Sequence, residues 1–175
     1  MRIRVAHSPD PDDAFMFYGL ARGLIPSPGL AFQHILQDIQ TLNERAMRSE
    51  LHITAISIHS YAHLMDKYAL LPTGSSMGDG YGPVLVAREE VPHDELGSLK
   101  VAIPGELTSA ALALKMWNPE LDTVVLPFDA VMPAVSAGEV DAGVVIHEGQ
   151  LTWEDEGFHA IVDLGVWWAE ETGGL

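Results

Sequence analysis

The strongest candidate for chemistry is a histidine that follows a short apolar run near the end of the chain. Residues 142–146 are Ala, Gly, Val, Val and Ile, a run typical of a buried strand, and His147 stands where that strand should end. In open α/β sheets, ligands bind beside the carboxyl ends of the strands. An imidazole there can act as an acid or a base near neutral pH, which makes His147 a candidate catalytic residue. A lone histidine after a strand is more often an ordinary loop residue, and the spacing alone leaves both interpretations open.

Two strand-to-helix junctions carry further groups that can contact a ligand. Ala55, Ile56 and Ser57 close a predicted strand, so the Ser57 hydroxyl and the following N–H groups can face a ligand. Ser109 and Ala110 open a helix rich in Ala and Leu. The first turn of a helix has free N–H donors and a positive dipole end, which suit a carboxylate or a phosphate. Both junctions have a simpler interpretation as plain helix caps, and the residues alone do not decide between the two.

Other polar residues favour structural roles. His59 and His63 are four apart and would share one helix face, but the pattern of a zinc protease is not completed, so we predict no metal site. Asp12 and Asp13 are placed to cap a helix predicted at 14–21. The sequence has no cysteine, which excludes a disulfide, a thiolate nucleophile and a cysteine-based metal site.

The composition is that of a globular and strongly acidic protein. The 175 residues are 47% hydrophobic and 19% charged, with a formal net charge of −16. So acidic a surface argues against nucleic acid and anionic membranes as partners, although local N–H groups can still bind a small anion. Only about five strand-like residues follow the basic start, too few for a signal peptide. No apolar run reaches membrane-spanning length, so we expect a cytoplasmic protein.

The elements that must position these residues alternate between strands and helices. Strands are predicted at 3–7, 30–36, 53–57, 69–71, 84–88, 100–103, 123–126, 142–146 and 159–164. Helices are predicted at 14–21, 38–47, 58–67, 109–117 and 129–137, with a short helix or turn at 151–156. This alternation favours an α/β fold with largely parallel sheets. A polar stretch at 89–97 predicts two lobes, residues 1–90 and 91–175, with a cleft between them.

An ordered set of motifs along the chain resembles a known family. The motifs are Ser8-Pro9 with Pro11 and Asp13, Asp38 with Thr41-Leu42-Asn43, Gly82-Pro83, Pro104-Gly105, Gly138-Glu139-Val140, Ile146-His147-Glu148, Val162-Asp163-Leu164-Gly165, and Trp167-Trp168 with Glu171-Thr172-Gly173. Together they resemble the 1,4-dihydroxy-6-naphthoate synthase family of the futalosine route to menaquinone. The resemblance implies the two-lobed α/β fold of type 2 periplasmic binding proteins, which agrees with the predicted alternation and boundary.

The resemblance also implies an activity and a site. Members of this family are lyases that convert cyclic dehypoxanthinyl futalosine to 1,4-dihydroxy-6-naphthoate without a metal or an organic cofactor. By resemblance, His147 is the general base, and the substrate contacts fall on the segment that ends at Ser57 and on Ser109 with Ala110. We expect the two lobes to close on a small anionic substrate while His147 abstracts a proton. A non-catalytic binding protein of the same fold, for a small carboxylate-bearing ligand, is the alternative.

Two features depart from the family pattern. The first family motif is Ser-Pro-Cys-Pro-Asn-Asp-Thr, whereas Asp10 and Asp12 place two acids here, which disfavour an anionic substrate beside them. Family chains also continue past the Trp-Trp motif and return to complete lobe one, so we expect the C-terminal return segment to be absent. Trp167 and Trp168 would then lie near a flexible end, where self-association or a missing C-terminal segment would cover them.

Overall fold

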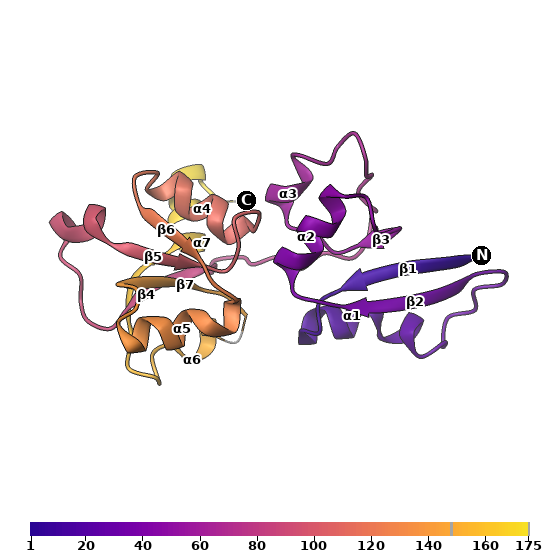
Figure 1. The fold of residues 1–175 in the computed structure, drawn as a ribbon, viewed down its shortest axis with the longest axis horizontal. Helices are drawn as coiled ribbons and strands as arrows, with labels where there is room; N and C mark the ends of the chain where they lie inside the picture. The colour runs from indigo at the N-terminus through magenta and orange to yellow at the C-terminus, as the bar shows by residue number, and fades with distance from the viewer. Residues whose placement is uncertain (148, 175) are drawn as a thin grey trace. The chain divides into compact units, whose positions relative to one another are not determined.

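The computed structural model describes residues 1–147 and 149–174 and divides the chain into two compact units, Met1–Met77 and Gly78–Leu175 (Figure 1). Glu148, the last residue of the predicted Ile-His-Glu motif, lies outside the described residues. Each unit has its own sheet and its own buried apolar residues. The division falls earlier than the predicted boundary near residue 90, between Met77 and Gly78.

The first unit is built on a three-stranded parallel sheet with the order β2-β1-β3. Its strands and helices are β1 (Arg2–His7), α1 (Pro11–Ala21), β2 (Ala31–Leu36), α2 (Ile39–Met47), β3 (Ile53–Thr54) and α3 (Ile58–Tyr61). Ala6, Leu42 and Leu51 form a buried cluster against which Ile35 and Ala55 pack. Because all three strands are parallel, their carboxyl ends lie at one edge of the sheet. That edge carries the end of β1 and the predicted ligand contacts that follow β3.

Helix α2 shows how the sequence places polar side chains inside this unit. Asp38 is its N-cap, and its carboxylate accepts the Thr41 backbone N–H at 2.9 Å, which satisfies one of the free donors of the first turn. The helix then turns Leu42, Asn43 and Ala46 toward the interior, where each is fully buried. Asn43 therefore lies at a depth where an amide needs hydrogen-bond partners.

Three predicted elements of this unit differ from the structure. The strand predicted at 53–57 ends at Thr54, although the Ala55 N–H still donates to the Ala6 carbonyl at 2.8 Å. The helix predicted at 58–67 ends at Tyr61 because the chain continues in three-residue turns, such as the bond from the Leu64 N–H to the Tyr61 carbonyl at 2.9 Å. No strand forms at 69–71, which is largely exposed.

The second unit contains a five-stranded sheet with the order β6-β5-β7-β4-β8 (Figure 1). Its elements are β4 (Val84–Ala87), the 3-10 helix η1 (His93–Ser98), β5 (Lys100–Ile103), α4 (Ser109–Trp117), β6 (Asp122–Val125), α5 (Phe128–Ala137), β7 (Ala142–Val145), α6 (Gly149–Thr152), β8 (His159–Asp163) and α7 (Leu164–Thr172). β5 is parallel to β6 and β7, whereas β4 is antiparallel to β7 and β8. The sheet is therefore mixed rather than largely parallel, and β4 belongs to it rather than to the first unit.

Apolar side chains cover both faces of this sheet. Successive residues of a strand point to opposite faces, so Val101 and Ile103 join one buried cluster while Ala102 joins the other. The first cluster includes Leu114 of α4, and the second includes Val131 of α5. A sheet sandwiched between helices explains why these strands are continuous apolar runs rather than alternating ones.

The end of the described chain is a helix. Asp163 caps α7, because its carboxylate accepts the N–H groups of Gly165 at 2.8 Å and Val166 at 3.1 Å. Trp167 packs against the buried cluster beneath the helix, and Trp168 is 36% exposed. The helix over residues 164–172 was not predicted, and the Trp pair belongs to it.

Two motif glycines meet where the chain enters β4. A Cβ placed on Gly82 would lie 2.5 Å from the backbone nitrogen of Gly165, and a Cβ on Gly165 would contact the backbone of Tyr81 and Gly82 as closely. The Leu164 N–H donates to the Pro83 carbonyl at 2.9 Å beside this crossing. Only residues without a side chain permit this approach of two backbones.

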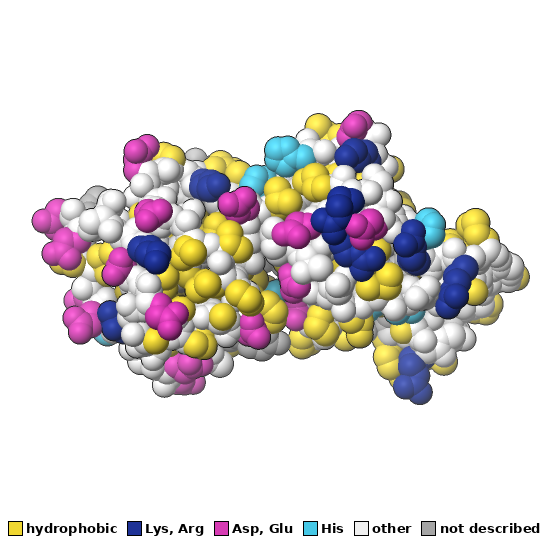
Figure 2. Space-filling model, in the orientation of Figure 1, with side chains coloured by type: hydrophobic (Ala, Val, Ile, Leu, Met, Phe, Trp, Pro, Cys, Tyr) yellow, Lys and Arg dark blue, Asp and Glu magenta, His cyan; other side chains and the backbone are white. Residues whose placement is uncertain are grey.

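The acidic charge belongs mainly to the second unit. Six of the nine Lys and Arg residues precede residue 78, whereas eighteen of the twenty-five Asp and Glu residues follow it. Figure 2 shows dark blue Lys and Arg side chains gathered over the first unit on the face in view. Within the described part of the chain, no helix is long and apolar enough to cross a membrane.

Candidate active site

One edge of the second unit brings together His147, Ser109 and Ala110. Strands β5 and β7 pair in parallel, with Val101 opposite Ala142 and Ala102 opposite Gly143. Their carboxyl ends therefore lie side by side. His147 follows the end of β7, and the turn after β5 leads into the first residues of α4. This arrangement matches the usual location of ligands in α/β sheets.

His147 adopts a backbone conformation that is unusual for its residue type. Its φ angle is 54°, in the left-handed region, which costs a non-glycine residue about 1–3 kcal/mol. Ser49, in the turn after α2, is the other non-glycine residue of the described chain with a positive φ. Strained positions of this kind cluster at active sites and ligand clamps. The backbone of His147 therefore strengthens the interpretation of this residue as functional.

An aromatic ring supports the His147 imidazole. The Phe128 ring, at the start of α5, stands edge-on to it, with the ring centroids 5.3 Å apart and the planes at 77°. Such edge-to-face pairs contribute about 0.5–1.5 kcal/mol beyond the area that they bury. Phe128 was not among the predicted site residues. Its position three residues after β6, at the edge that carries the other candidates, is the signal that could have identified it.

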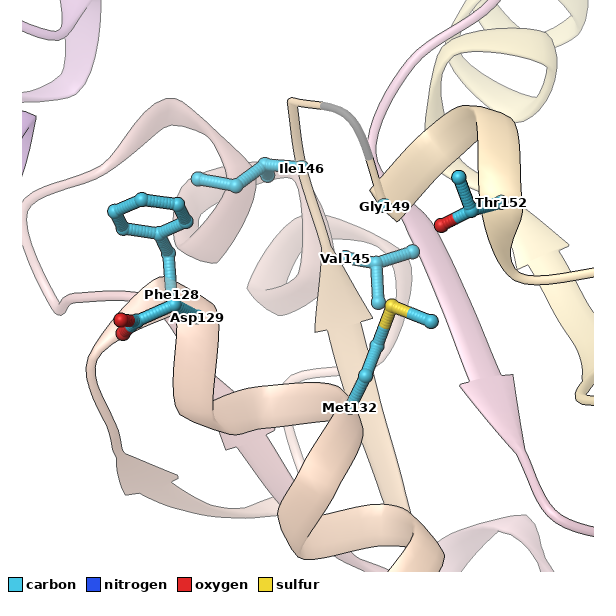
Figure 3. A pocket seen from close by; sticks show the side chains of 7 residues that line it. All are labelled: Phe128, Asp129, Met132, Val145, Ile146, Gly149 and Thr152. Carbon is cyan, nitrogen blue, oxygen red and sulfur yellow. The ribbon is translucent and has the colours of Figure 1, made fainter. Parts of the chain in front are cut away.

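A small pocket lies beside this pair of rings. It has a volume of about 180 Å³ and is lined by Phe128, Asp129, Met132, Val145, Ile146, Gly149 and Thr152 (Figure 3). In Figure 3 the Phe128 side chain reaches toward Ile146, the residue that precedes His147. The lining is mainly apolar, and the pocket borders the candidate site at Phe128 and Ile146.

The start of α4 supplies hydrogen-bond donors. Thr108 is the N-cap, since its hydroxyl accepts the Ala111 N–H at 3.1 Å and donates to the Gly105 carbonyl at 2.7 Å. The cap interpretation is thus confirmed for Thr108. The next two N–H groups, of Ser109 and Ala110, lie in the first turn, where the helix itself offers no acceptor. Ser109 is exposed and Ala110 is buried. The start of α4 is therefore a candidate anion site.

The corresponding edge of the first unit carries Ser57. Ser57 precedes α3 but makes no side-chain cap hydrogen bond, so the interpretation as a plain cap is wrong here. Its side chain and backbone are instead bound by Asn43 of α2, through bonds of 3.0 Å and 2.9 Å. Ala55 and Ile56 are half-buried between β3 and Ser57. The predicted contacts of this unit thus form one short segment, whose last residue is hydrogen-bonded to the buried amide of Asn43.

A pair of histidines lies at the same edge. His7 ends β1, is 5% exposed, and stacks on the Phe17 ring with the centroids 4.2 Å apart. Its Nδ1 faces the Ser8 carbonyl at 3.0 Å and must carry the proton, because a carbonyl oxygen only accepts. Its Nε2 lies 3.0 Å from Nδ1 of His34, within hydrogen-bond distance. The remaining Nε2 of His34 is buried without a partner in the described chain. Burial and the neighbouring His7 lower the pKa of His34.

This shift predicts a loss of stability in mild acid. A depressed histidine pKa stabilises the fold above the unfolded value near 6.5, and the contribution is lost as the pH falls toward the folded pKa. We expect the free energy of unfolding to fall as the pH drops below about 6.5, and His34→Gln to reduce that slope. Urea unfolding at several pH values measures it, with the exposed His159→Gln as the control. An equal slope in wild type and His34→Gln would contradict this assignment.

The acids of the first motif do not cap α1 as predicted. Asp13 turns back and accepts the Ser8 N–H at 2.6 Å, while Asp10 accepts the Ser8 hydroxyl at 2.6 Å. Asp12 accepts the N–H of the residue after it at 2.9 Å. Burial raises the pKa of Asp13 more than the bond from Ser8 lowers it. These carboxylates therefore organise the turn after β1.

No metal centre is formed by the side chains that the structure describes, since no three His, Asp or Glu residues are grouped to hold an ion. The rings of His59 and His63 lie 5.8 Å apart at a tilt of 55°.

The fold and the position of the candidate residues define the class of protein. The chain is similar in structure to the alkanesulfonate-binding protein of Xanthomonas axonopodis pv. citri, with a TM-score of 0.67 and 12% identity over 93% of this chain and 60% of that one. It is also similar to an arginine periplasmic binding protein of Legionella pneumophila, with a TM-score of 0.60 and 10% identity over 99% and 95%. The chain therefore has the α/β fold of type 2 periplasmic binding proteins, as predicted.

The chain belongs to the menaquinone biosynthesis family, whose model matches residues 3–175. It is 39% identical to the 1,4-dihydroxy-6-naphthoate synthase of Thermus thermophilus, over 98% of this chain and 62% of that protein. The synthase of Streptomyces coelicolor is 37% identical, with the same coverage. A crystal structure of an Archaeoglobus fulgidus protein is 47% identical, with a TM-score of 0.92 over 98% of this chain and 63% of that one. The chain thus spans a little over three fifths of the length of these relatives.

Proposed function

We propose that this chain is a lyase that forms 1,4-dihydroxy-6-naphthoate from cyclic dehypoxanthinyl futalosine, in the cytoplasm. The observation that carries the proposal is His147, a histidine with a left-handed backbone at the carboxyl end of β7, at the sheet edge where the turn after β5 leads into α4. Two curated relatives named for this synthase match almost the whole chain, which supports the choice of reaction.

In this proposal each part of the site has one task. The N–H groups of Ser109 and Ala110 bind the carboxylate of the substrate, since a helix start favours an anion. The unprotonated imidazole of His147 takes a proton from the sugar-derived ring, and Phe128 limits the orientations of that imidazole. Ala55, Ile56 and Ser57 supply substrate contacts from the first unit. No task in this scheme requires a cofactor.

A turnover assay tests the proposal. The 175-residue chain is incubated with cyclic dehypoxanthinyl futalosine, and the naphthoate is followed by mass spectrometry. Enzyme-dependent formation of the naphthoate, with retention of the rate in the exposed control His159→Ala, is the expected result. A chain that forms no naphthoate above the uncatalysed background would refute the enzyme assignment.

The alternative is a binding protein for a small carboxylate, because structural neighbours of the same fold are binding proteins. A thermal-shift titration with 1,4-dihydroxy-6-naphthoate distinguishes the two. Saturable stabilisation without turnover would favour the binding protein.

A further inference from the structure

We propose that Asn43 is a positioning residue that makes the Ser57 hydroxyl a hydrogen-bond donor toward the ligand, and thereby selects a ligand group that accepts. The inference rests on the proposed function, in which Ser57 contacts the substrate. In this proposal Asn43 does not touch the ligand, but it determines that the Ser57 hydroxyl donates to the ligand rather than accepts.

Two hydrogen bonds join these residues inside the first unit. The Ser57 backbone N–H donates to Oδ1 of Asn43 at 2.9 Å, and Nδ2 of Asn43 donates to Oγ of Ser57 at 3.0 Å. Asn43 is fully buried, and Ser57 is 9% exposed. A buried amide with both ends engaged has little freedom to turn, so the pair fixes the position of Oγ.

The backbone determines which end of the amide faces which atom. Amide oxygen and nitrogen are distinguished by their partners, and a backbone N–H can only donate. The atom of Asn43 next to the Ser57 N–H must therefore be the oxygen, which places the NH₂ group against Oγ. One lone pair of the Ser57 hydroxyl is then already used.

The remaining capacity of the hydroxyl defines the ligand. Among the described residues, no acceptor is found for the Ser57 hydroxyl proton, while its oxygen already receives a proton from Asn43. The hydroxyl can donate to a carboxylate or a carbonyl oxygen of the ligand. A ligand N–H group is less favoured, because the Ser57 oxygen already accepts a hydrogen bond from Asn43. Ser57 thus favours the same kind of group as the donors of Ser109 and Ala110.

Asn43→Asp tests this directly, because it retains the shape and exchanges the donor for an acceptor. The aspartate can still accept the Ser57 N–H, but it would also accept the Ser57 hydroxyl proton and withdraw it from the ligand. Losing a hydrogen bond to a charged group corresponds to a rise in KM of roughly tenfold or more, with a smaller change in kcat. Asn118→Asp, the same exchange at a helix end in the second unit, is the matched control and should leave KM unchanged.

Ser57→Ala separates a ligand effect from a folding defect. Ser57→Ala should raise KM by a similar factor. The double variant Asn43→Asp with Ser57→Ala should raise KM no further, because each change removes the same hydrogen bond from the Ser57 hydroxyl to the ligand. An unchanged KM in a folded Asn43→Asp variant would overturn the inference. So would a double variant whose KM rises by the product of the two single effects.

A measurement on the free protein keeps the test independent of turnover. In amide NMR spectra, Ser57→Ala should shift the side-chain NH₂ signals of Asn43 and leave those of Asn118 in place. If the wild type forms no naphthoate, the proposed function fails, and this spectrum still decides whether Asn43 donates to Ser57. Unshifted Asn43 signals would overturn the inference whatever the activity.

Discussion

Replacement of His147 by alanine should lower kcat by about 10²–10⁴-fold, the usual contribution of a positioned general base. The imidazole stands at the carboxyl end of β7 and against the Phe128 ring, which limits its orientations. Alanine therefore removes both the base and its fixed position. KM should change little, since the N–H groups of α4 that are proposed to bind the substrate carboxylate are unchanged. Initial rates over a range of substrate concentrations measure both constants.

The left-handed backbone of His147 provides a second, independent readout. Asparagine tolerates this conformation better than most residues, and glycine adopts it without strain. His147→Gly should therefore be as inactive as His147→Ala while unfolding at the same or a higher temperature than the wild type. Near-normal turnover by either variant would remove His147 from the mechanism. A large loss of stability in His147→Gly would contradict the strain argument.

Replacement of Gly165 by alanine should be the most damaging single-methyl change in the second unit. The added Cβ would meet the backbone of Tyr81 and Gly82, which cannot rotate aside as a side chain can. Overpacking usually costs about 1–3 kcal/mol, and we expect Gly165→Ala to reach the upper end of that range or exceed it. Urea unfolding at constant pH measures the change.

Gly97 offers a matched control for this substitution. A Cβ there would find no atom within 4 Å, and its backbone is not in the left-handed region. Gly97→Ala should therefore leave the stability unchanged or raise it by about 0.4–1 kcal/mol. If Gly165→Ala were as well tolerated as Gly97→Ala, the close crossing of the two backbones would be refuted.

The sequence predicts well those features that depend on local patterns. The apolar run at 142–146 and the capping residue Asp38 predict β7 and α2 nearly to the residue, because strand burial and helix capping are determined by neighbours in the chain. The position of His147 at the end of β7 follows from the same pattern. The fold class follows from the alternation of elements and from the family resemblance, and the structural comparisons confirm it.

Features that depend on contacts between distant residues are not predictable from those patterns. A buried strand has the same composition in either direction, so the antiparallel β4 cannot be distinguished from a parallel strand in the sequence. The bonds between Asn43 and Ser57 join residues fourteen positions apart, and the imidazole contact of His7 with His34 joins residues twenty-seven apart. Each of these contacts depends on how the helices and strands pack.

The direction of β4 also determines where the connection between the two units is attached. Because β4 is antiparallel to β7, its first residue Val84 lies opposite Val145 and beside Asp163. Residues 78–83 therefore join the second sheet at the end that carries His147, beside the crossing of Gly82 and Gly165. The segment that connects the two units and the candidate catalytic base therefore leave neighbouring strands at one end of the second sheet.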